Sequence, residues 1–315
     1  MRKVLLPSFL FALLALLLLS PERYFTSVQG GVMLFASAVL PSMLPYFFFT
    51  KLLTATGCVG GLSATLGRPV SRAYRVAPIA AYPLLMSFLS GYPVGARVLG
   101  DLHAKGLISD RDAVRAASFT STSGSMFVLG SVGAVILGDT AAAVVILASH
   151  YLGALVNGFF YRGKKKKEAP ASPLPPLVSS PENLLSDAMY ESVLSLALVG
   201  GFIAIANLLG DMASDLLSRL FPSLFAGATL ASGMLYGAFE VTRGCVEFAS
   251  LGVSRAMKAA LCALAVSFGG LSVLLQSMAF LGKTGIKQGK LLLMKTTQAG
   301  VSFALALGLG SIFLN

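Results

Sequence analysis

Four interruptions within long apolar segments constrain the fold of this chain more than any other feature. They lie at residues 90–93, 121–125, 237–244 and 269–272, and each contains glycine. Gly and Pro in a helix interior free backbone polar groups, and hydrocarbon contains no water to satisfy them. A helix interrupted at membrane depth therefore lines a cavity or lies buried in protein. Interrupted segments at corresponding places in the two halves of a chain indicate the substrate site of a transporter.

The composition places the chain in a membrane. Of its 315 residues, 56% are hydrophobic and 12% are charged, whereas soluble domains carry about 25% charged residues. Several apolar runs exceed the roughly 20 residues that a helix needs to cross a bilayer. We therefore predict an all-α polytopic membrane protein surrounded by the lipid bilayer. The net charge of +11 comes mostly from loops between predicted spans, so we expect no nucleic-acid partner.

The positions of Lys and Arg select one topology. Three full crossings over residues 76–161 would place Arg162 and the lysines at residues 164–167 outside, against the preference of basic residues for the cytoplasmic side. These residues fall inside if residues 76–105 form a re-entrant hairpin with its tip at residues 90–93. By the same reasoning we predict a second hairpin at residues 224–248, broken spans at residues 116–137 and 258–281, a cytoplasmic loop at residues 51–75 and an amphipathic stretch at residues 211–222.

The predicted architecture is an inverted repeat of two halves. Each half contains a span, a re-entrant helical hairpin, a broken transmembrane helix and a closing span, and an extra N-terminal span precedes the first half. A basic, Pro-rich linker joins the halves on the cytoplasmic side. The predicted boundaries are residues 1–24 for the N-terminal span, 25–163 for the first repeat, 164–183 for the linker and 184–315 for the second repeat.

Arg97 and Arg243 follow the two hairpin interruptions at nearly equivalent positions. A charge at membrane depth costs a few kcal/mol or more, so it usually has a partner, a water-filled path or a ligand. Because guanidinium binds carboxylate through two parallel hydrogen bonds, two such side chains would suit a small dianion. The alternative is that Arg97 pairs with Asp101 and that Arg243 pairs with Glu240 or Glu247.

Glu240 and the hydroxyl residues at the interruptions complete the candidate site. Glu240 lies in a Gly-rich interruption, where it either couples transport to a proton or to sodium or is a fixed counter-ion to an arginine. Hydroxyl and amide side chains in membrane helices either bind substrate or join helices. The candidate substrate-binding residues are Ser90, Gly91, Tyr92, Pro93, Gly95, Arg97, Ser123, Gly124, Ser125, Glu240, Thr242, Arg243, Gly244, Gly269, Gly270, Ser272 and Gln276.

The sequence gives no indication of enzyme chemistry. Cys58, Cys245 and Cys262 show neither CxxC nor Cys/His spacing, so we expect no metal. His103 and His150 lie far apart, and we interpret His150 as a packing or helix-capping residue. Neither a Ser/His nor a paired-Asp arrangement is visible, and the chain lacks a Walker motif. We therefore expect no cofactor and no enzymatic activity, and an oligomer remains compatible with the sequence.

Four segments resemble a known family. SGYPVGARVLGDLHAKGLIS, FTSTSGSMFVLGSVG, GAFEVTRGC and SFGGLSVLLQS are similar to the nucleoside-recognition (Gate) domain membrane proteins and, within them, to sporulation integral membrane proteins. The resemblance runs from about residue 28 to the end. It implies two Gate repeats, a relation to concentrative nucleoside transporters, and export of dipicolinic acid from the mother cell across the outer forespore membrane. The positions that match are residues 90–97, 123–125, 239–245 and 269–272.

Three functions follow from these observations. The leading hypothesis is a secondary transporter of a small organic anion, and the resemblance implies dipicolinate, a flat dianion that agrees with the two-arginine interpretation. The second is a nucleoside or nucleobase transporter, which would use neutral polar contacts rather than arginines. The third is a non-transporting membrane scaffold in spore assembly.

Overall fold

The predicted all-α polytopic fold is confirmed. The structure, a computed structural model, describes residues 2–163, 183–225, 227 and 229–314, and all regular elements in these residues are helices. The predicted linker lies outside the described residues except for Asn183. The helical segments long and apolar enough to cross a membrane are Pro21–Ala55, Thr140–Phe160, Leu184–Leu220, Arg255–Thr284 and Gln288–Phe313.

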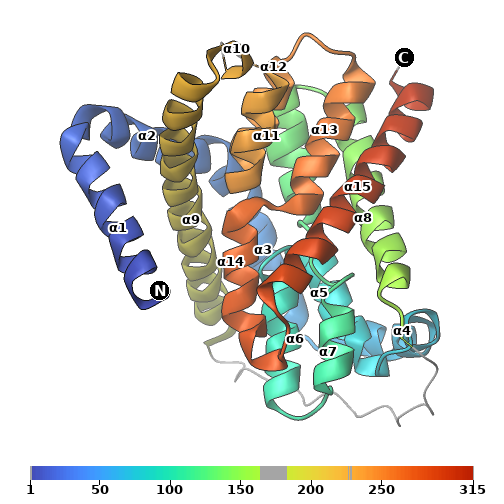
Figure 1. Ribbon diagram of the computed structural model, residues 1–315. Coiled ribbons are helices and arrows are strands. Elements are labelled where there is room, and N and C mark those ends of the chain that lie inside the picture. Colours follow the sequence, from blue (N-terminus) through green and yellow to red (C-terminus); the bar gives the residue numbers. More distant parts are fainter. Residues whose placement is uncertain (1, 164–182, 226, 228, 315) are drawn as a thin grey trace.

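The N-terminal helices lie at one edge of the bundle. Figure 1 shows α1 (Arg2–Leu19) outermost, beside α2 (Pro21–Leu34) and α9 (Leu184–Leu220). A small apolar cluster of α1, α2 and α9 side chains holds them together. A π-helical segment, η1 (Phe35–Val39), joins α2 to α3 (Leu40–Ala55). Because α1 is short and carries a proline, its identification as an N-terminal span stays a prediction.

The sequence predicts a loop at residues 51–75, but this segment is largely helical in the structure. Helix α4 covers Cys58–Tyr74. Its buried positions recur at helical spacing along one face, with Val59, Val70 and Tyr74 among them. Of the basic residues on which the prediction rested, Arg68 and Arg72 lie on the exposed side of this amphipathic helix, so the charge pattern concealed an apolar face.

The first hairpin and the first broken span form where the sequence predicts them. Helices α5 (Ala81–Ser90) and α6 (Val94–Ala104) pack against each other across a tip at residues 91–93. Residues 117–124 are not helical and separate α7 (Asp110–Ala116) from η3 (Phe127–Leu137). The other helices of this half are η2 (Pro78–Ala80) and α8 (Thr140–Phe160).

The second half opens with a longer helix than predicted. Helix α9 continues to Leu220 and so includes most of residues 211–222, which are predicted as a separate amphipathic stretch. Polar residues in this part of α9 contact side chains of α2 and α11 (Leu230–Phe239), and these contacts stabilise the continued helix. Asp211 accepts a hydrogen bond of 2.6 Å from the hydroxyl of Tyr236, and Asp215 forms an ion pair of 2.9 Å with Arg23.

The second hairpin and the second broken span also agree with the prediction. The hairpin turns at Glu240, between α11 and α12 (Val241–Ser250), and the broken span is interrupted at Gly269. Figure 1 shows α5 and α6 in the lower half of the bundle and α11 and α12 in the upper half, so the two hairpins enter from opposite ends. The remaining helices are α10 (Pro222–Phe225), α13 (Arg255–Phe268), α14 (Gly270–Leu281), η5 (Gly282–Thr284) and α15 (Gln288–Phe313).

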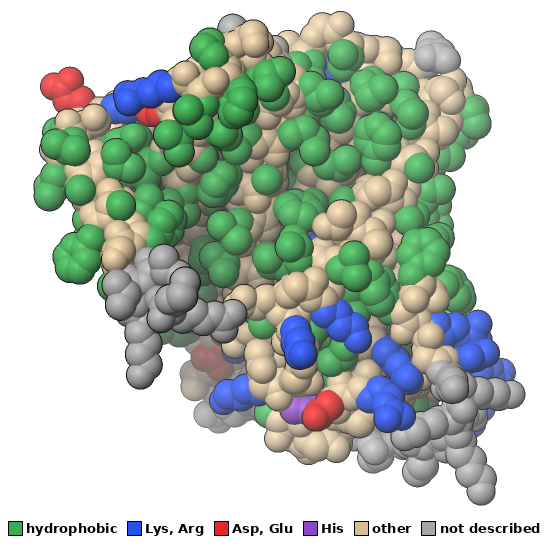
Figure 2. Space-filling view, in the orientation of Figure 1, with side chains coloured by type: hydrophobic (Ala, Val, Ile, Leu, Met, Phe, Trp, Pro, Cys, Tyr) green, Lys and Arg blue, Asp and Glu red, His purple; other side chains and the backbone are tan. Residues whose placement is uncertain are grey.

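The surface separates apolar from basic residues. Figure 2 shows apolar side chains over most of the visible face, while Lys and Arg gather at the end where α6 and α7 lie. Large apolar side chains such as Phe11, Leu198 and Phe160 are exposed around the bundle. Such a band suits contact with lipid, and the basic end is the one that the sequence predicts to be cytoplasmic.

The topology makes a testable prediction. Cysteines introduced at Ser109 and at Ser172, which lies outside the described residues, should both react with a membrane-impermeant thiol reagent only from the cytoplasmic side. The background should carry Cys58→Ser, because Cys58 is exposed whereas Cys245 and Cys262 are buried. Labelling of Ser109→Cys from outside would contradict the re-entrant first hairpin and, with it, the inverted repeat.

Candidate functional site

Each hairpin tip lies directly against the interruption of the following broken span. A Cβ atom added at Gly91 would lie 2.3 Å from the backbone nitrogen of Gly124. In the second half, a Cβ atom at Gly270 would lie 2.7 Å from the carbonyl oxygen of Phe239. Both glycines also have positive φ, 72° and 70°, a conformation that side chains disfavour. Glycine therefore allows backbone to meet backbone at both places.

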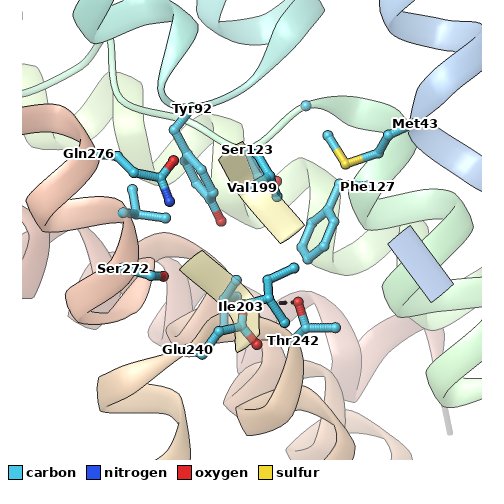
Figure 3. Close-up of a pocket in the computed structure, with 13 residues that line it drawn as sticks. Met43, Tyr92, Ser123, Phe127, Val199, Ile203, Glu240, Thr242, Ser272 and Gln276 are labelled. Atoms are coloured by element: carbon cyan, nitrogen blue, oxygen red, sulfur yellow. Dashed lines mark hydrogen bonds between the residues drawn. The ribbon is translucent and has the colours of Figure 1, made fainter. Parts of the chain in front are cut away.

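A small cavity lies between the four interruptions (Figure 3). Its volume of about 30 Å³ holds about two water molecules. Sites for small molecules measure about 300–1,000 Å³, so the site is closed in this conformation. Seven of the predicted site residues line the cavity: Tyr92, Ser123, Gly124, Glu240, Thr242, Ser272 and Gln276. Apolar lining residues that the sequence did not indicate are Met43, Phe127, Val199, Ile203, Val241 and Val273.

Four helix N-termini converge on this cavity. Tyr92 precedes α6, and Ser123 and Gly124 precede the helical turn that begins at Ser125. Glu240 is the N-cap of α12, and α14 begins just before the lining residues Ser272 and Gln276. A helix N-terminus carries a partial positive charge and unpaired N–H groups. The cavity therefore favours a ligand or side chain with negative charge.

Glu240 is the acidic side chain that lines this cavity. Its side chain is only 2% exposed and lies across the cavity from Tyr92 (Figure 3). It accepts hydrogen bonds from the backbone nitrogen of Arg243 at 2.8 Å and from the hydroxyl of Thr242 at 3.0 Å. The Arg243 guanidinium instead donates to Glu247 at 3.0 Å. Of the alternatives for Arg243, the pair with Glu247 is formed, and Glu240 caps a helix rather than neutralising a guanidinium.

Neither of the two predicted arginines lines the cavity. Arg97 lies exposed on α6, and its side chain forms no ion pair or hydrogen bond with the described residues, including Asp101. Arg243 lies with its guanidinium carbon 4.7 Å from the centre of the Tyr236 ring. Both lie in the first turn of the helix that follows a hairpin tip, but on a face that does not line the cavity. A joint grip on a dianion stays a prediction that this conformation does not assemble.

The other predicted site residues shape the backbone around the cavity. A Cβ atom at Gly95 would lie 2.1 Å from the carbonyl oxygen of Thr120. The Ser125 hydroxyl lies 2.8 Å from that of Tyr46, so it joins η3 to α3. The predicted residues that do not line the cavity are Ser90, Gly91, Pro93, Gly95, Arg97, Ser125, Arg243, Gly244, Gly269 and Gly270.

His150 joins the two broken spans. Its side chain is fully buried on α8, and Nε2 accepts a hydrogen bond of 2.8 Å from the backbone nitrogen of Ser123. Because Nε2 is the acceptor, Nδ1 carries the proton and donates to the hydroxyl of Ser267 at 2.7 Å. One imidazole thus connects the interruption of the first half to the helix that precedes Gly269, a role beyond the predicted packing or capping.

Lys295 is a second residue that the sequence did not assign to the site. It lies on α15 and is 3% exposed. Its ammonium donates to the carbonyl oxygen of Ser121, in the interruption at residues 121–125, at 2.9 Å. A lone lysine within an apolar span is the signal that could have indicated it, because an ionisable residue at membrane depth is a candidate for function.

Comparison with known proteins gives one similarity. The sporulation integral membrane protein YlbJ of Bacillus subtilis (strain 168) is 29% identical over 316 residues, which cover 90% of this chain and 77% of YlbJ. No protein family and no solved structure matches the chain. Together with the long apolar helices, the similarity supports a multi-pass integral membrane protein related to a protein of sporulation.

Proposed function

We propose that this chain is a secondary transporter of a small organic anion, and that it exports dipicolinic acid from the mother cell across the outer forespore membrane. The observation that carries the proposal is the convergence of four helix N-termini on one cavity at the interruptions. Such ends bind anions without a fixed cation. The resemblance to dipicolinate transporters and the similarity to a sporulation membrane protein favour this anion.

We further propose that the two halves are inverted Gate repeats that give alternating access. Each hairpin packs on the broken span of the other half: α6 on α14, and α12 on η3. The first contact is close, because a Cβ atom at Gly100 would lie 2.7 Å from the carbonyl oxygen of Phe280. Since the hairpins enter from opposite ends, withdrawal of one tip would open the closed cavity to one side only (Figure 1).

Glu240 is the proposed coupling group. An ionised carboxylate in the cavity would repel an entering anion, and this repulsion is strong where water is excluded. A proton on Glu240 removes it, so anion and proton would move together. The groups that face Glu240 are Tyr92 of the first hairpin and Thr242 and Cys245 of α12. Sodium is the alternative coupling ion, with the carboxylate as its ligand.

A nucleoside or nucleobase is the second candidate substrate. The observation that favours it is the neutral polar character of the lining, with Ser123, Thr242, Ser272 and Gln276 available as hydrogen-bond partners. No Lys or Arg occurs among the described residues that line the cavity. Such a wall would bind a neutral ligand in the way that a nucleoside carrier requires.

Uptake into vesicles distinguishes these functions. Purified protein in proteoliposomes should accumulate labelled dipicolinate under an imposed proton gradient, and excess uridine should not compete. Uptake of uridine with no uptake of dipicolinate would assign the chain to nucleoside transport. Uptake of neither, by protein shown to be folded, would contradict the transport proposal and favour a scaffold in spore assembly.

A further inference from the structure

Lys295 is a buried lysine that pairs with no acidic side chain within the part of the chain that the structure describes. Its side chain is 3% exposed on α15, a long apolar helix. None of the ion pairs of the described residues includes it. Burying an unpaired charge is expensive, so a buried lysine without an acidic partner is a candidate for binding an anion.

The hydrogen bonds of the Lys295 ammonium are incomplete. An ammonium has three donors, and N–H···O bonds are normally 2.7–3.2 Å long. Only the bond to the carbonyl oxygen of Ser121, at 2.9 Å, lies in this range. The Ser121 hydroxyl is 3.5 Å away, and Oε1 of Gln298 is 3.3 Å away. Two of the three donors therefore make only long, weak hydrogen bonds.

Gln298 adds a donor without an acceptor at the same place. It lies one turn along α15 from Lys295, is 1% exposed and turns its oxygen toward the ammonium. Its amide nitrogen, Nε2, is buried and has no hydrogen-bond partner among the described residues. Leaving a buried donor unpaired is energetically unfavourable. The two side chains together thus lack acceptor oxygens of the kind that a carboxylate supplies.

Tyr92 lies next to both Lys295 and the cavity. The ammonium lies 5.7 Å from the centre of the Tyr92 ring, and the same ring lines the cavity (Figure 3). Ser123, two residues after the ammonium's acceptor Ser121, lines the cavity as well. Because Tyr92 belongs to the tip of the first hairpin, withdrawal of that tip would uncover the ammonium to a ligand in the cavity.

We propose that Lys295 and Gln298 bind one carboxylate of the transported anion when the first hairpin withdraws Tyr92. This inference rests on the proposed function and names its anion-binding residues. The carboxylate supplies the missing acceptors and neutralises the buried charge, while the rest of the ligand occupies the cavity at the helix N-termini. The site takes small carboxylates and discriminates against neutral ligands of the same shape.

The test compares a charged ligand with its neutral counterpart. Binding of pyridine-2,6-dicarboxylate and of pyridine-2,6-dicarboxamide is measured by calorimetry on the full-length protein in nanodiscs, in buffer free of divalent cations. The wild type should prefer the dicarboxylate, and Lys295→Gln should lower that preference ten- to a hundredfold, as expected for the loss of a charge-assisted contact. Lys258→Gln is the matched control, because Lys258 also donates to a backbone carbonyl, that of Ala249 at 2.7 Å, but lines a different pocket, together with Asp139 and Arg255.

Each outcome decides between the claims. An unchanged preference in folded Lys295→Gln overturns the inference, as does a loss of preference in Arg97→Gln or Arg243→Gln but not in Lys295→Gln. If Lys295→Gln does not fold, Gln298→Leu decides instead: it keeps the charge, and its preference should fall two- to tenfold. Failure of the wild type to bind the dicarboxylate would contradict the proposed function itself.

Discussion

Gly91→Ala should abolish uptake and reduce the thermal stability of the protein. The new Cβ atom would lie 2.3 Å from the backbone nitrogen of Gly124, where only backbone could move to relieve the overlap. The backbone conformation of Gly91, with φ 72° and ψ −171°, is nearly exclusive to glycine and costs an alanine about 1–3 kcal/mol, and overpacking a tight contact costs about 1–3 kcal/mol more. Their sum is a large fraction of the stability of a typical protein. The measurements are dipicolinate uptake and the unfolding temperature in detergent.

Gly106→Ala separates the two causes. Gly106 has nearly the same φ, 69°, but no atom lies within 4 Å of an added Cβ atom there. This variant should lose only the backbone term and keep its transport. Equal damage from both substitutions would show that backbone strain alone is responsible, and the close approach of the hairpin tip to the broken span would lose its importance.

Glu240→Gln should abolish uptake driven by a pH gradient while leaving exchange of dipicolinate across the membrane. The glutamine cannot release or bind a proton, yet its oxygen can still accept the N-cap hydrogen bond from the backbone nitrogen of Arg243. Folding should therefore survive the change. The measurement compares gradient-driven uptake with counterflow in the same proteoliposomes.

Glu247→Gln is the control for this experiment. Glu247 pairs with the guanidinium of Arg243 and does not line the cavity, so its substitution should leave the pH dependence unchanged. A folded Glu240→Gln protein with the pH dependence of the wild type would remove the coupling role. Loss of both modes in Glu240→Gln would indicate that the carboxylate is needed for binding or folding instead.

The interruptions could be predicted because they are local. Glycine, proline and hydroxyl residues within an apolar run disrupt a helix wherever the rest of the chain lies, so the tips at residues 91–93 and at Glu240 followed from composition. The same holds for the broken spans. Seven candidate residues reach the cavity because each lies in or just after an interruption.

Lys295 and His150 could not be assigned in this way. Each is a single polar residue in an apolar helix, and its partners come from distant parts of the chain. The acceptor of Lys295, Ser121, is separated from it by 174 positions, and it is a backbone carbonyl that carries no sequence signal. Only the packing of α8 and α15 around the interruption at residues 121–125 reveals these contacts.

The arginines show a different limit of the sequence. Both arginines lie in the helix that follows a hairpin tip, but spacing alone does not say which face of a helix a side chain takes. Arg97 is exposed, and Arg243 pairs with Glu247, which lies one turn further along the same helix. Likewise, the charges of residues 51–75 and 211–222 concealed helices whose buried partners lie elsewhere in the chain.

Protection of a cysteine in the cavity by dipicolinate tests whether the anion passes through this cavity. Ser272 lines the cavity on α14, and Ser277 on the same helix is equally buried but does not line it. Each is replaced by Cys in the Cys58→Ser background, and the rate of alkylation by a small thiol reagent is measured with and without dipicolinate. Dipicolinate should slow the alkylation of Ser272→Cys and leave that of Ser277→Cys unchanged. Equal rates at Ser272→Cys with and without dipicolinate, at concentrations that saturate uptake, would contradict passage of the anion through this cavity.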